Sequence, residues 1–246
     1  MIINAIERML LNQYYCSLNE LHSSNTIYTV CENTKQNYLK ILTYQNCIVV
    51  CTSKNLQNNI KSILQYKNKD EIFENPFVYG QTIHYVPNDI HYNMSFPQNY
   101  QTEFVFGESI KYVKIENHFQ NAFYIDQYGN TATKAIYMAK QHGKVIAVAG
   151  ASKTNFDNIY EIGIDVMEQH RGKGVASYLV NELTKKCIEK NIVPFYSASV
   201  TNIASQMVAS KCHYIPLWMD TFGTILDGSS AYHNILNKLI LELIPS

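Results

Sequence analysis

Residues 159–180 read IYEIGIDVMEQHRGKGVASYLV, and this stretch decides the fold. In its first part Ile162, Ile164 and Val166 alternate with acidic residues and glycine. Such period-two alternation predicts a strand with one buried face. In its last part small and apolar residues form one stripe of a helix, which we predict from about Gly174 to Lys190. The stretch therefore predicts a strand, a glycine-rich loop and a helix, in that order.

The predicted loop has the features of an anion-binding site. The first backbone N–H groups of a helix lack partners within the helix, and the helix dipole places partial positive charge there. Gly172 and Gly174 lack Cβ atoms, so the backbone there can approach phosphate oxygens closely. Arg171 and Lys173 supply the charge that two phosphates require. The sequence therefore predicts a diphosphate ligand at the start of this helix.

Other phosphate-binding motifs match this stretch less well. The nucleotide P-loop, G-x-x-x-x-G-K-[ST], does not occur in the chain. The dinucleotide fingerprint needs a third glycine where Ser177 stands, and its first glycine follows the strand more closely. A capped helix without any ligand stays open as an alternative.

The same residues resemble the diagnostic loop of the GNAT acyltransferases, [QR]-x-x-G-x-[GA]. Gln169, Gly172 and Gly174 occupy its three defined positions. The second half of that signature is also similar, because a predicted strand over residues 193–200 is followed by Asn202-x-x-Ser205 at the start of a helix. The resemblance covers about residues 126–226. More faintly, residues 77–85 and a two-part layout resemble a bacterial GNAT subgroup that includes the zwittermicin A self-resistance acetyltransferase.

The predicted elements and the resemblance imply an α/β (α+β) fold. We expect a GNAT-type mixed and partly splayed β-sheet flanked by helices, preceded by a smaller α/β domain. The smaller domain is predicted over residues 1–125, as a substrate platform or lid, with a strand and a helix over 47–64. The acetyl-CoA-binding catalytic domain is predicted over residues 126–246. Its last element is an amphipathic helix that includes residues 235–243.

The resemblance implies an N-acetyltransferase that moves an acetyl group from acetyl-CoA to a primary amine by direct attack on the thioester. It implies that the pantetheine arm lies between the strands 159–166 and 193–200. Main-chain groups of Ile164 and Val166 would hold that arm, and an amide near Val166 would polarise the thioester carbonyl. The implied coenzyme-binding residues are Ile164, Val166, Gln169, Arg171, Gly172, Lys173, Gly174, Val175, Ala176, Ser177, Asn202 and Ser205.

Candidate catalytic residues are fewer. Glu161 and Asp165 share the polar face of the predicted strand, so each is a candidate base, although both are also compatible with solvated carboxylates. Many GNAT members have a general-acid tyrosine seven residues after the position of Asn202, but here that position is Ala209. His213 and Tyr196 are possible substitutes. Otherwise water protonates the thiolate, or catalysis is weak, which keeps an acyl-CoA-binding module or sensor open as an alternative function.

Composition narrows the choice of partners. Twenty basic residues balance twenty acidic ones, so neither nucleic acid nor an anionic membrane is predicted as a partner. This balance favours a small-molecule amine as the acceptor. A homodimer is a further possible assembly. The six cysteines show no zinc-binding spacing, and no metal is predicted. Glu7 and Arg8 interrupt the apolar start of the chain, so no signal peptide is predicted and we expect a cytoplasmic protein with reduced thiols.

Overall fold

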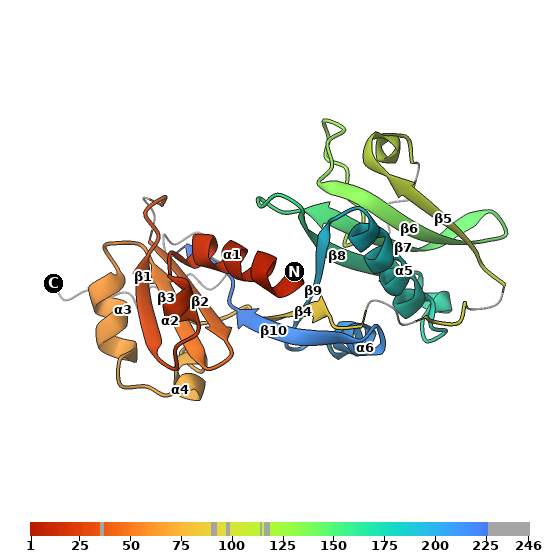
Figure 1. The fold of residues 1–246 in the computed structure, drawn as a ribbon. Helices are drawn as coiled ribbons and strands as arrows, with labels where there is room; N and C mark the ends of the chain where they lie inside the picture. The colour runs from red at the N-terminus through yellow and green to blue at the C-terminus, as the bar shows by residue number, and fades with distance from the viewer. Residues whose placement is uncertain (35–36, 90–92, 97–98, 114, 116–118, 226–246) are drawn as a thin grey trace. The chain divides into compact units, whose positions relative to one another are not determined.

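The computed structural model describes residues 1–34, 37–89, 93–96, 99–113, 115 and 119–225 (Figure 1). These residues divide into two compact units, of which the first consists mainly of residues 3–84 and the chain from Leu217 onwards. The second consists mainly of residues 85–216. The division therefore falls at residues 84/85, whereas the sequence placed it at 125/126. The predicted terminal helix over 235–243 lies outside the described residues.

The first unit is an α/β unit whose strands follow the order β1-β3-β2-β10. β1 is parallel to β3, and β2 is antiparallel to both β3 and β10, with the short β11 also paired to β2. β4 and β10 each run from one unit into the other. The elements are α1 (Ile2–Tyr14), α2 (Leu18–Leu21), β1 (Thr26–Val30), β2 (Tyr38–Tyr44), β3 (Cys47–Thr52), α3 (Gln57–Leu64), α4 (Lys69–Phe73), β4 (Thr82–Pro87), β10 (Tyr214–Asp220) and β11 (Thr224–Ile225).

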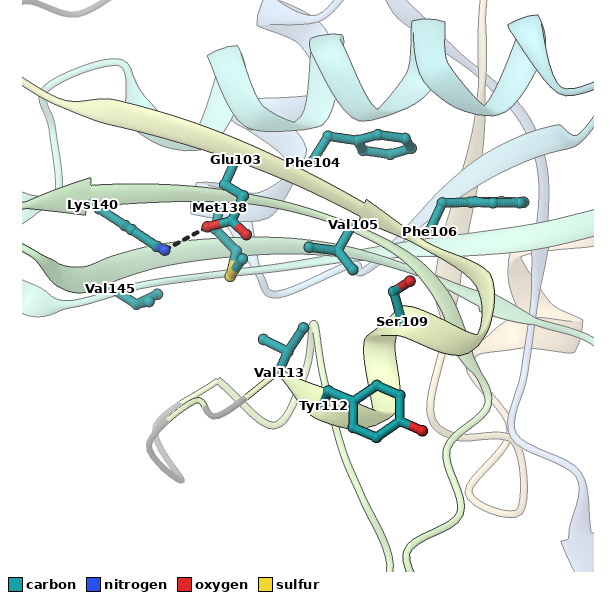
Figure 2. A pocket seen from close by; sticks show the side chains of 10 residues that line it. All are labelled: Glu103, Phe104, Val105, Phe106, Ser109, Tyr112, Val113, Met138, Lys140 and Val145. Atoms are coloured by element: carbon teal, nitrogen blue, oxygen red, sulfur yellow. Dashed lines mark hydrogen bonds and ion pairs between the residues drawn. The ribbon is translucent and has the colours of Figure 1, made fainter.

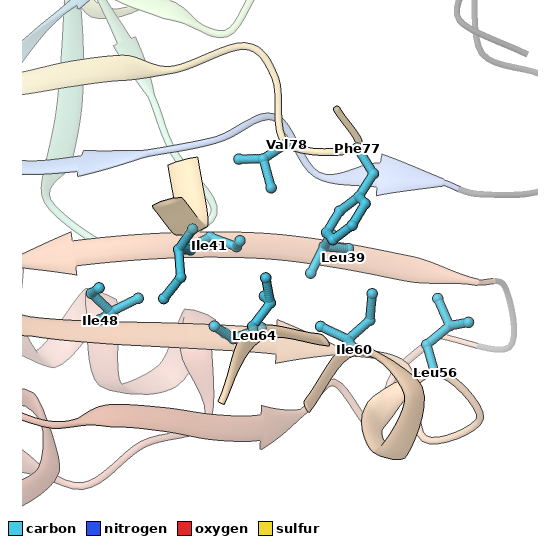
Figure 3. Close-up of a cluster of buried hydrophobic side chains, with 10 residues drawn as sticks. Leu39, Ile41, Ile48, Leu56, Ile60, Leu64, Phe77 and Val78 are labelled. Atoms are coloured by element: carbon cyan, nitrogen blue, oxygen red, sulfur yellow. The ribbon is translucent and has the colours of Figure 1, made fainter. Parts of the chain in front are cut away.

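The core of the first unit lies between its sheet and the helices α3 and α4 (Figure 3). Leu39 and Ile41 are two residues apart on β2, so both side chains point to the same face of the sheet. Ile60 and Leu64, one helical turn apart on α3, pack against that face. The predicted strand and helix over residues 47–64 are confirmed as β3 and α3.

The second unit contains a sheet with the strand order β9-β8-β7-β6-β5. Neighbouring strands from β5 to β8 are antiparallel, and α5 carries the chain from β8 to the parallel strand β9. The mixed sheet that we predicted is therefore confirmed. The elements are β5 (Gln101–Phe106), the 3₁₀ helix η1 (Gly107–Tyr112), β6 (Thr133–Gln141), β7 (Lys144–Lys153), β8 (Ile159–Val166), the 3₁₀ helix η2 (Glu168–His170), α5 (Val175–Glu189), β9 (Val193–Ser199) and α6 (Ile203–Lys211).

The parallel strands β8 and β9 pair over only part of their length. Their register runs from Ile159 opposite Val193 to Ile162 opposite Tyr196. Beyond that pair β8 continues to Val166 and β9 continues to Ser199. The predicted partly splayed sheet is confirmed, and the splayed ends leave main-chain groups of both strands facing a gap. Among the residues that the structure describes, no helix has the length and apolar character to cross a bilayer.

Candidate active site

The loop before α5 brings a helix start and two glycines together. Gly174 is the N-cap of α5 with φ 80°, and Gly172 has φ 74°. Both lie in the left-handed region that favours glycine. A Cβ atom built at either residue would meet nothing within 4 Å, so the space beside the loop is open. Within the described part of the chain no side chain caps this end of α5, and its first main-chain N–H groups therefore face that space.

A cavity of about 520 Å³ lies at this helix start. All but two of the predicted coenzyme-binding residues line it. The exceptions are Gln169 and Lys173, whose side chains are exposed on the loop. The sequence did not point to His170, which lines the cavity, is buried, and has Nδ1 3.1 Å from the hydroxyl of Tyr100. The predicted residues that line the cavity are Ile164, Val166, Arg171, Gly172, Gly174, Val175, Ala176, Ser177, Asn202 and Ser205.

The end of β8 presents main-chain groups toward the gap between the splayed strands. Val166 lies opposite Ala147 of β7, while the amide of the next residue, Met167, donates to the carbonyl of Ile146 at 2.9 Å. This pattern makes Val166 and Ala147 a non-hydrogen-bonded pair of the antiparallel ladder. The N–H and C=O groups of Val166 therefore point away from β7, and so do those of Ile164 two residues earlier.

Arg171 is held beside the same strand end. Its Nε donates to the carbonyl oxygen of Val166 at 3.1 Å. The resemblance assigns main-chain groups of Val166 to the pantetheine arm, so Arg171 and the arm would share this residue. The contact places the guanidinium at the mouth of the cavity, and the terminal nitrogens remain as charged donors on its fork.

A second cavity, of about 350 Å³, adjoins the first. The two share the lining residues Asn121, Ile164, Asn202 and Ser205. Among its described lining residues the one carboxylate is Glu161, which is exposed on β8. The splayed ends of β8 and β9 therefore connect a helix-start cavity with a polar cavity that holds one acidic group.

Asn202 lines both cavities, and Tyr196 lines the smaller one. Asn202 Oδ1 accepts the amide of Ser205 at 3.1 Å, so the predicted N-cap of α6 is confirmed. Tyr196 is buried, and burial raises the pKa of its phenol, while a side-chain hydrogen bond from Ser205 opposes that rise. Ala209, which replaces the tyrosine of the GNAT pattern, is fully buried on α6.

Asp165 makes more contacts than a solvated carboxylate would. Its Oδ2 accepts the main-chain amides of Asn121 at 2.8 Å and Ala122 at 3.0 Å. Its Oδ1 accepts the side-chain amide of Asn121 at 2.7 Å. Both oxygens are therefore committed to one segment of the chain, residues 119–123. The one sequence signal for this contact is Gly163, since an isolated glycine within a strand can mark a close approach of another backbone.

His213 lies apart from both cavities. It is exposed in the turn between α6 and β10, with φ 57°, and it lines neither cavity. Its carbonyl oxygen accepts the amide of Asn88 at 3.0 Å. This turn therefore keeps a left-handed backbone at a residue other than glycine.

A third hollow, of about 560 Å³, lies beside β5 and η1 (Figure 2). Val105, Val113 and Val145 line it, and Lys140 forms an ion pair with Glu103 at its side. None of the residues singled out in the sequence lies there. Among the described residues no group of three or more His, Cys, Asp or Glu side chains is arranged to hold a metal ion.

Comparison with known proteins bears on the family. The profile of the GNAT acetyltransferase family matches residues 17–216, which include most of both compact units. A Bacillus subtilis (strain 168) protein, the uncharacterized N-acetyltransferase YdfB, is 30% identical over 95 residues. That match covers 37% of this chain and 36% of the relative, so the chain spans about a third of the length of this curated relative.

Solved structures give weaker matches. An acetyltransferase of the GNAT family from Colwellia psychrerythraea is 17% identical, with a TM-score of 0.46, over 65% of this chain and 61% of that chain. A GCN5-related N-acetyltransferase-like protein from Streptococcus suis 89/1591 is 15% identical, with a TM-score of 0.43, over 72% of this chain and 71% of that chain. The family profile spans more than half of the sequence, and the chain therefore belongs to the GNAT acetyltransferase family.

Proposed function

We propose that this enzyme transfers an acetyl group from acetyl-CoA to a primary amine of a small molecule. The observation that carries the proposal is the uncapped, glycine-lined start of α5, which opens onto the unpaired end of β8. When bound, acetyl-CoA supplies an activated acetyl group: the amine nitrogen bonds to the acetyl carbon, the C–S bond breaks, and the departing thiolate takes up a proton.

The helix start has the chemistry that a diphosphate needs. The N–H groups of Val175, Ala176 and Ser177 belong to the first turn of α5, where the helix dipole favours negative charge. Arg171 and Lys173 add two positive charges on the same loop. Residues Gly172 and Gly174 leave the approach free of side chains. These features support a coenzyme diphosphate at this end of the larger cavity.

The unpaired end of β8 suits an extended acyl-carrying arm. Ile164 and Val166 direct their main-chain groups toward the gap, where an arm with amide groups can pair with them as another strand would. The N–H of Val166 is then a fixed donor near the reacting carbonyl. Fixed donors aimed at developing negative charge lower the barrier of acyl transfer.

Glu161 is the candidate base of this proposal. An alkyl ammonium with a pKa near ~10.4 must lose a proton before its nitrogen can attack. Glu161 faces the smaller cavity, where it can accept that proton directly or through water. Asp165 is less suited to this role, because both of its oxygens already accept hydrogen bonds.

The remaining predictions about partners stay proposals. A neutral chain favours a small amine over a strongly charged polymer, and no nucleic acid, membrane or metal has a part in the proposed reaction. The role of residues 1–125 as substrate platform or lid, a homodimer, a cytoplasmic location and the zwittermicin A resistance subgroup also remain predictions. A second candidate function is an acyl-CoA-binding module with little turnover, which the buried Ala209 favours because α6 then carries no phenol at that position.

Calorimetric titration with CoA and acetyl-CoA tests the coenzyme site. We expect Gly172→Glu to abolish binding, because the new carboxylate would stand against the diphosphate. Gly143→Glu is the matched control: Gly143 also has a left-handed φ of 77° and open space around its Cβ position, but it lies in the β6–β7 turn. The control should bind CoA like the wild type, and equal affinity in both variants would contradict the site.

A thiol-release assay over a panel of primary amines then separates the two candidate functions. The panel contains a polyamine, an amino acid, an amino sugar and an aminoglycoside. Release of CoA that depends on one of these amines supports the transferase. Tight coenzyme binding without release for any amine supports the binding module.

A further inference from the structure

The segment 119–123 is packed against β7 and β8 more closely than a side chain would permit. Gly150 of β7 and Gly163 of β8 lie opposite each other in the ladder. A Cβ atom on Gly150 would come within 1.7 Å of the carbonyl oxygen of Ala122, and one on Gly163 within 2.0 Å of that of Asn121. The two glycines therefore make a shallow seat for this segment beside the splayed strands.

Buried apolar side chains also anchor the segment 119–123 on the sheet. Phe119, Ala122 and Phe123 are buried in a cluster with Ile136 of β6 and Val148 of β7. Asn121, between these anchors, is exposed. The apolar neighbours therefore fix the backbone of Asn121 while its own side chain faces outward.

Asp165 also fixes the orientation of the Asn121 amide. A carboxylate only accepts hydrogen bonds, so the Asn121 group 2.7 Å from Asp165 Oδ1 must be the NH₂ group. The amide oxygen of Asn121, on the other arm of the planar amide, then points away from Asp165 Oδ1. Within the described part of the chain no donor is bonded to this oxygen.

This oxygen belongs to a residue at the point where the proposed reactants meet. Asn121 lines both the cavity at the start of α5 and the cavity that contains Glu161. A neutral primary amine has two N–H groups and one lone pair. If one N–H is held by a fixed acceptor and the other faces Glu161, the lone pair takes no part in either hydrogen bond and is free to face the gap between β8 and β9.

We infer that Asn121 binds the acceptor amine through its amide oxygen, and that Asp165 is the positioning residue that holds this amide in the required orientation. The inference rests on the proposed function, because it assumes that the amine reacts at the junction of the two cavities. It assigns Asp165 a role other than that of the base, and it makes Asn121 a determinant of acceptor binding.

Steady-state kinetics test both roles, with the amine of the panel that gives the highest kcat/KM as the probe. Asn121→Ala should raise KM for that amine about tenfold, the effect of losing one hydrogen bond to a reacting group, and leave the Kd for CoA within about twofold. Asp165→Asn should raise KM for the amine as well, because an asparagine there can donate and so lets the Asn121 amide reverse. Gln101→Ala is the control, since this exposed amide on β5 lines neither cavity.

An unchanged KM for the amine in Asn121→Ala would overturn the inference, and so would an equal loss of CoA affinity. If no amine of the panel reacts, n-propylammonium chloride serves as the probe in a titration of the ¹⁵N-labelled protein with CoA bound. The side-chain amide signals of Asn121 should then shift in the wild type and not in Asp165→Asn. Static Asn121 signals in the wild type would overturn the inference, whereas failure of CoA to bind at all would count against the proposed function instead.

Discussion

At the scale of single residues, we propose Tyr196 as the group that protonates the departing thiolate. Its phenol lines the smaller cavity, and burial raises its pKa, so it stays protonated at neutral pH. A group that keeps its proton can serve as an acid but not as a base. The buried Ala209 contributes no donor on α6.

Tyr196→Phe should therefore lower kcat about 10- to 100-fold, the lower range for general acids, because a thiolate leaves more readily than most groups. The Kd for CoA should stay the same, since only the hydroxyl is removed. Tyr214→Phe is the matched control: Tyr214 is also buried and its hydroxyl lies 2.6 Å from that of Thr184, but it lines neither cavity. Equal kcat values for Tyr196→Phe and the wild type would show that water supplies the proton.

The candidate coenzyme site could be predicted from the sequence because its residues lie close together in the chain. The glycines and basic residues around Gly172 follow each other in the chain, and their spacing alone predicts a strand, a loop and a helix start. Asn121 could not be found in this way, because it meets Asp165 only through packing of segments 44 residues apart. His213 illustrates the reverse case, since a residue type suited to proton transfer lies in a turn that lines neither cavity.

At the scale of elements, β7 and β8 depend on a pair of glycines. Gly150→Ala and Gly163→Ala should each lower the free energy of unfolding by about 1–3 kcal/mol, because the new methyl group meets main-chain atoms that cannot turn aside. Both variants displace the same segment, residues 119–123. The double variant should therefore be less destabilised than the sum of the two, since the second methyl group enters space that the first has already opened.

Urea unfolding of the two single variants and the double variant measures this coupling. Two independent and additive losses would show that the glycines do not seat a common segment. The same variants should also raise KM for the amine, because Asn121 moves with the segment, and this effect separates the seat from a simple loss of packing.

Some element boundaries are marked by residues next to them in the sequence, whereas pairings between distant strands are not. The first helix, α1, ends before Tyr15, which adopts φ 54°, and α2 begins after Ser17. The capping box of Ser17 and Glu20 marks that break and can be read in the sequence. The pairing of β5 with β6 cannot be read in the sequence, because residues 107–132 separate the two strands. The predicted division at 125/126 falls between these paired strands of one sheet.

At the scale of the whole molecule, the first unit joins α1 near the start of the sequence to β10, which lies more than 200 residues later. Asp220 of β10 is buried, and it accepts hydrogen bonds from the hydroxyl of Tyr14 on α1 at 2.8 Å and from His84 Nε2 on β4 at 2.9 Å. Lys40 of β2 lies 2.8 Å from the same carboxylate. Four elements from distant parts of the sequence therefore meet at one acidic group, which no local pattern could reveal.

The Asp220 cluster makes the stability of the first unit sensitive to acid. Burial raises the pKa of the carboxyl, but the hydrogen bond and charge of His84 and the charge of Lys40 outweigh that rise, so the pKa of Asp220 lies below its ordinary value. A carboxyl whose pKa is lower in the folded state stabilises the fold above its unfolded pKa of about 3.9. This contribution is lost as the pH falls through the lower, folded value.

Asp220→Asn should therefore lower the free energy of unfolding by about 3 kcal/mol at pH 7, because Lys40 and Tyr14 lose their charged partner in a buried site. Urea unfolding from pH 7 down to pH 2 measures this difference with His84 kept in place, because the hydrogen bond and charge of His84 contribute to the lowered pKa of Asp220. The difference between the carboxylate and amide forms should stay constant down to about pH 4 and shrink below it, where the carboxylate takes up its proton. Asp157→Asn is the control, since Asp157 is 93% exposed beside Lys153 and should change the stability by less than about 0.5 kcal/mol. A difference that stayed constant to pH 2 would mean that the pKa of Asp220 is the same in the folded and the unfolded protein, and the charged cluster would then have no part in stabilising the first unit.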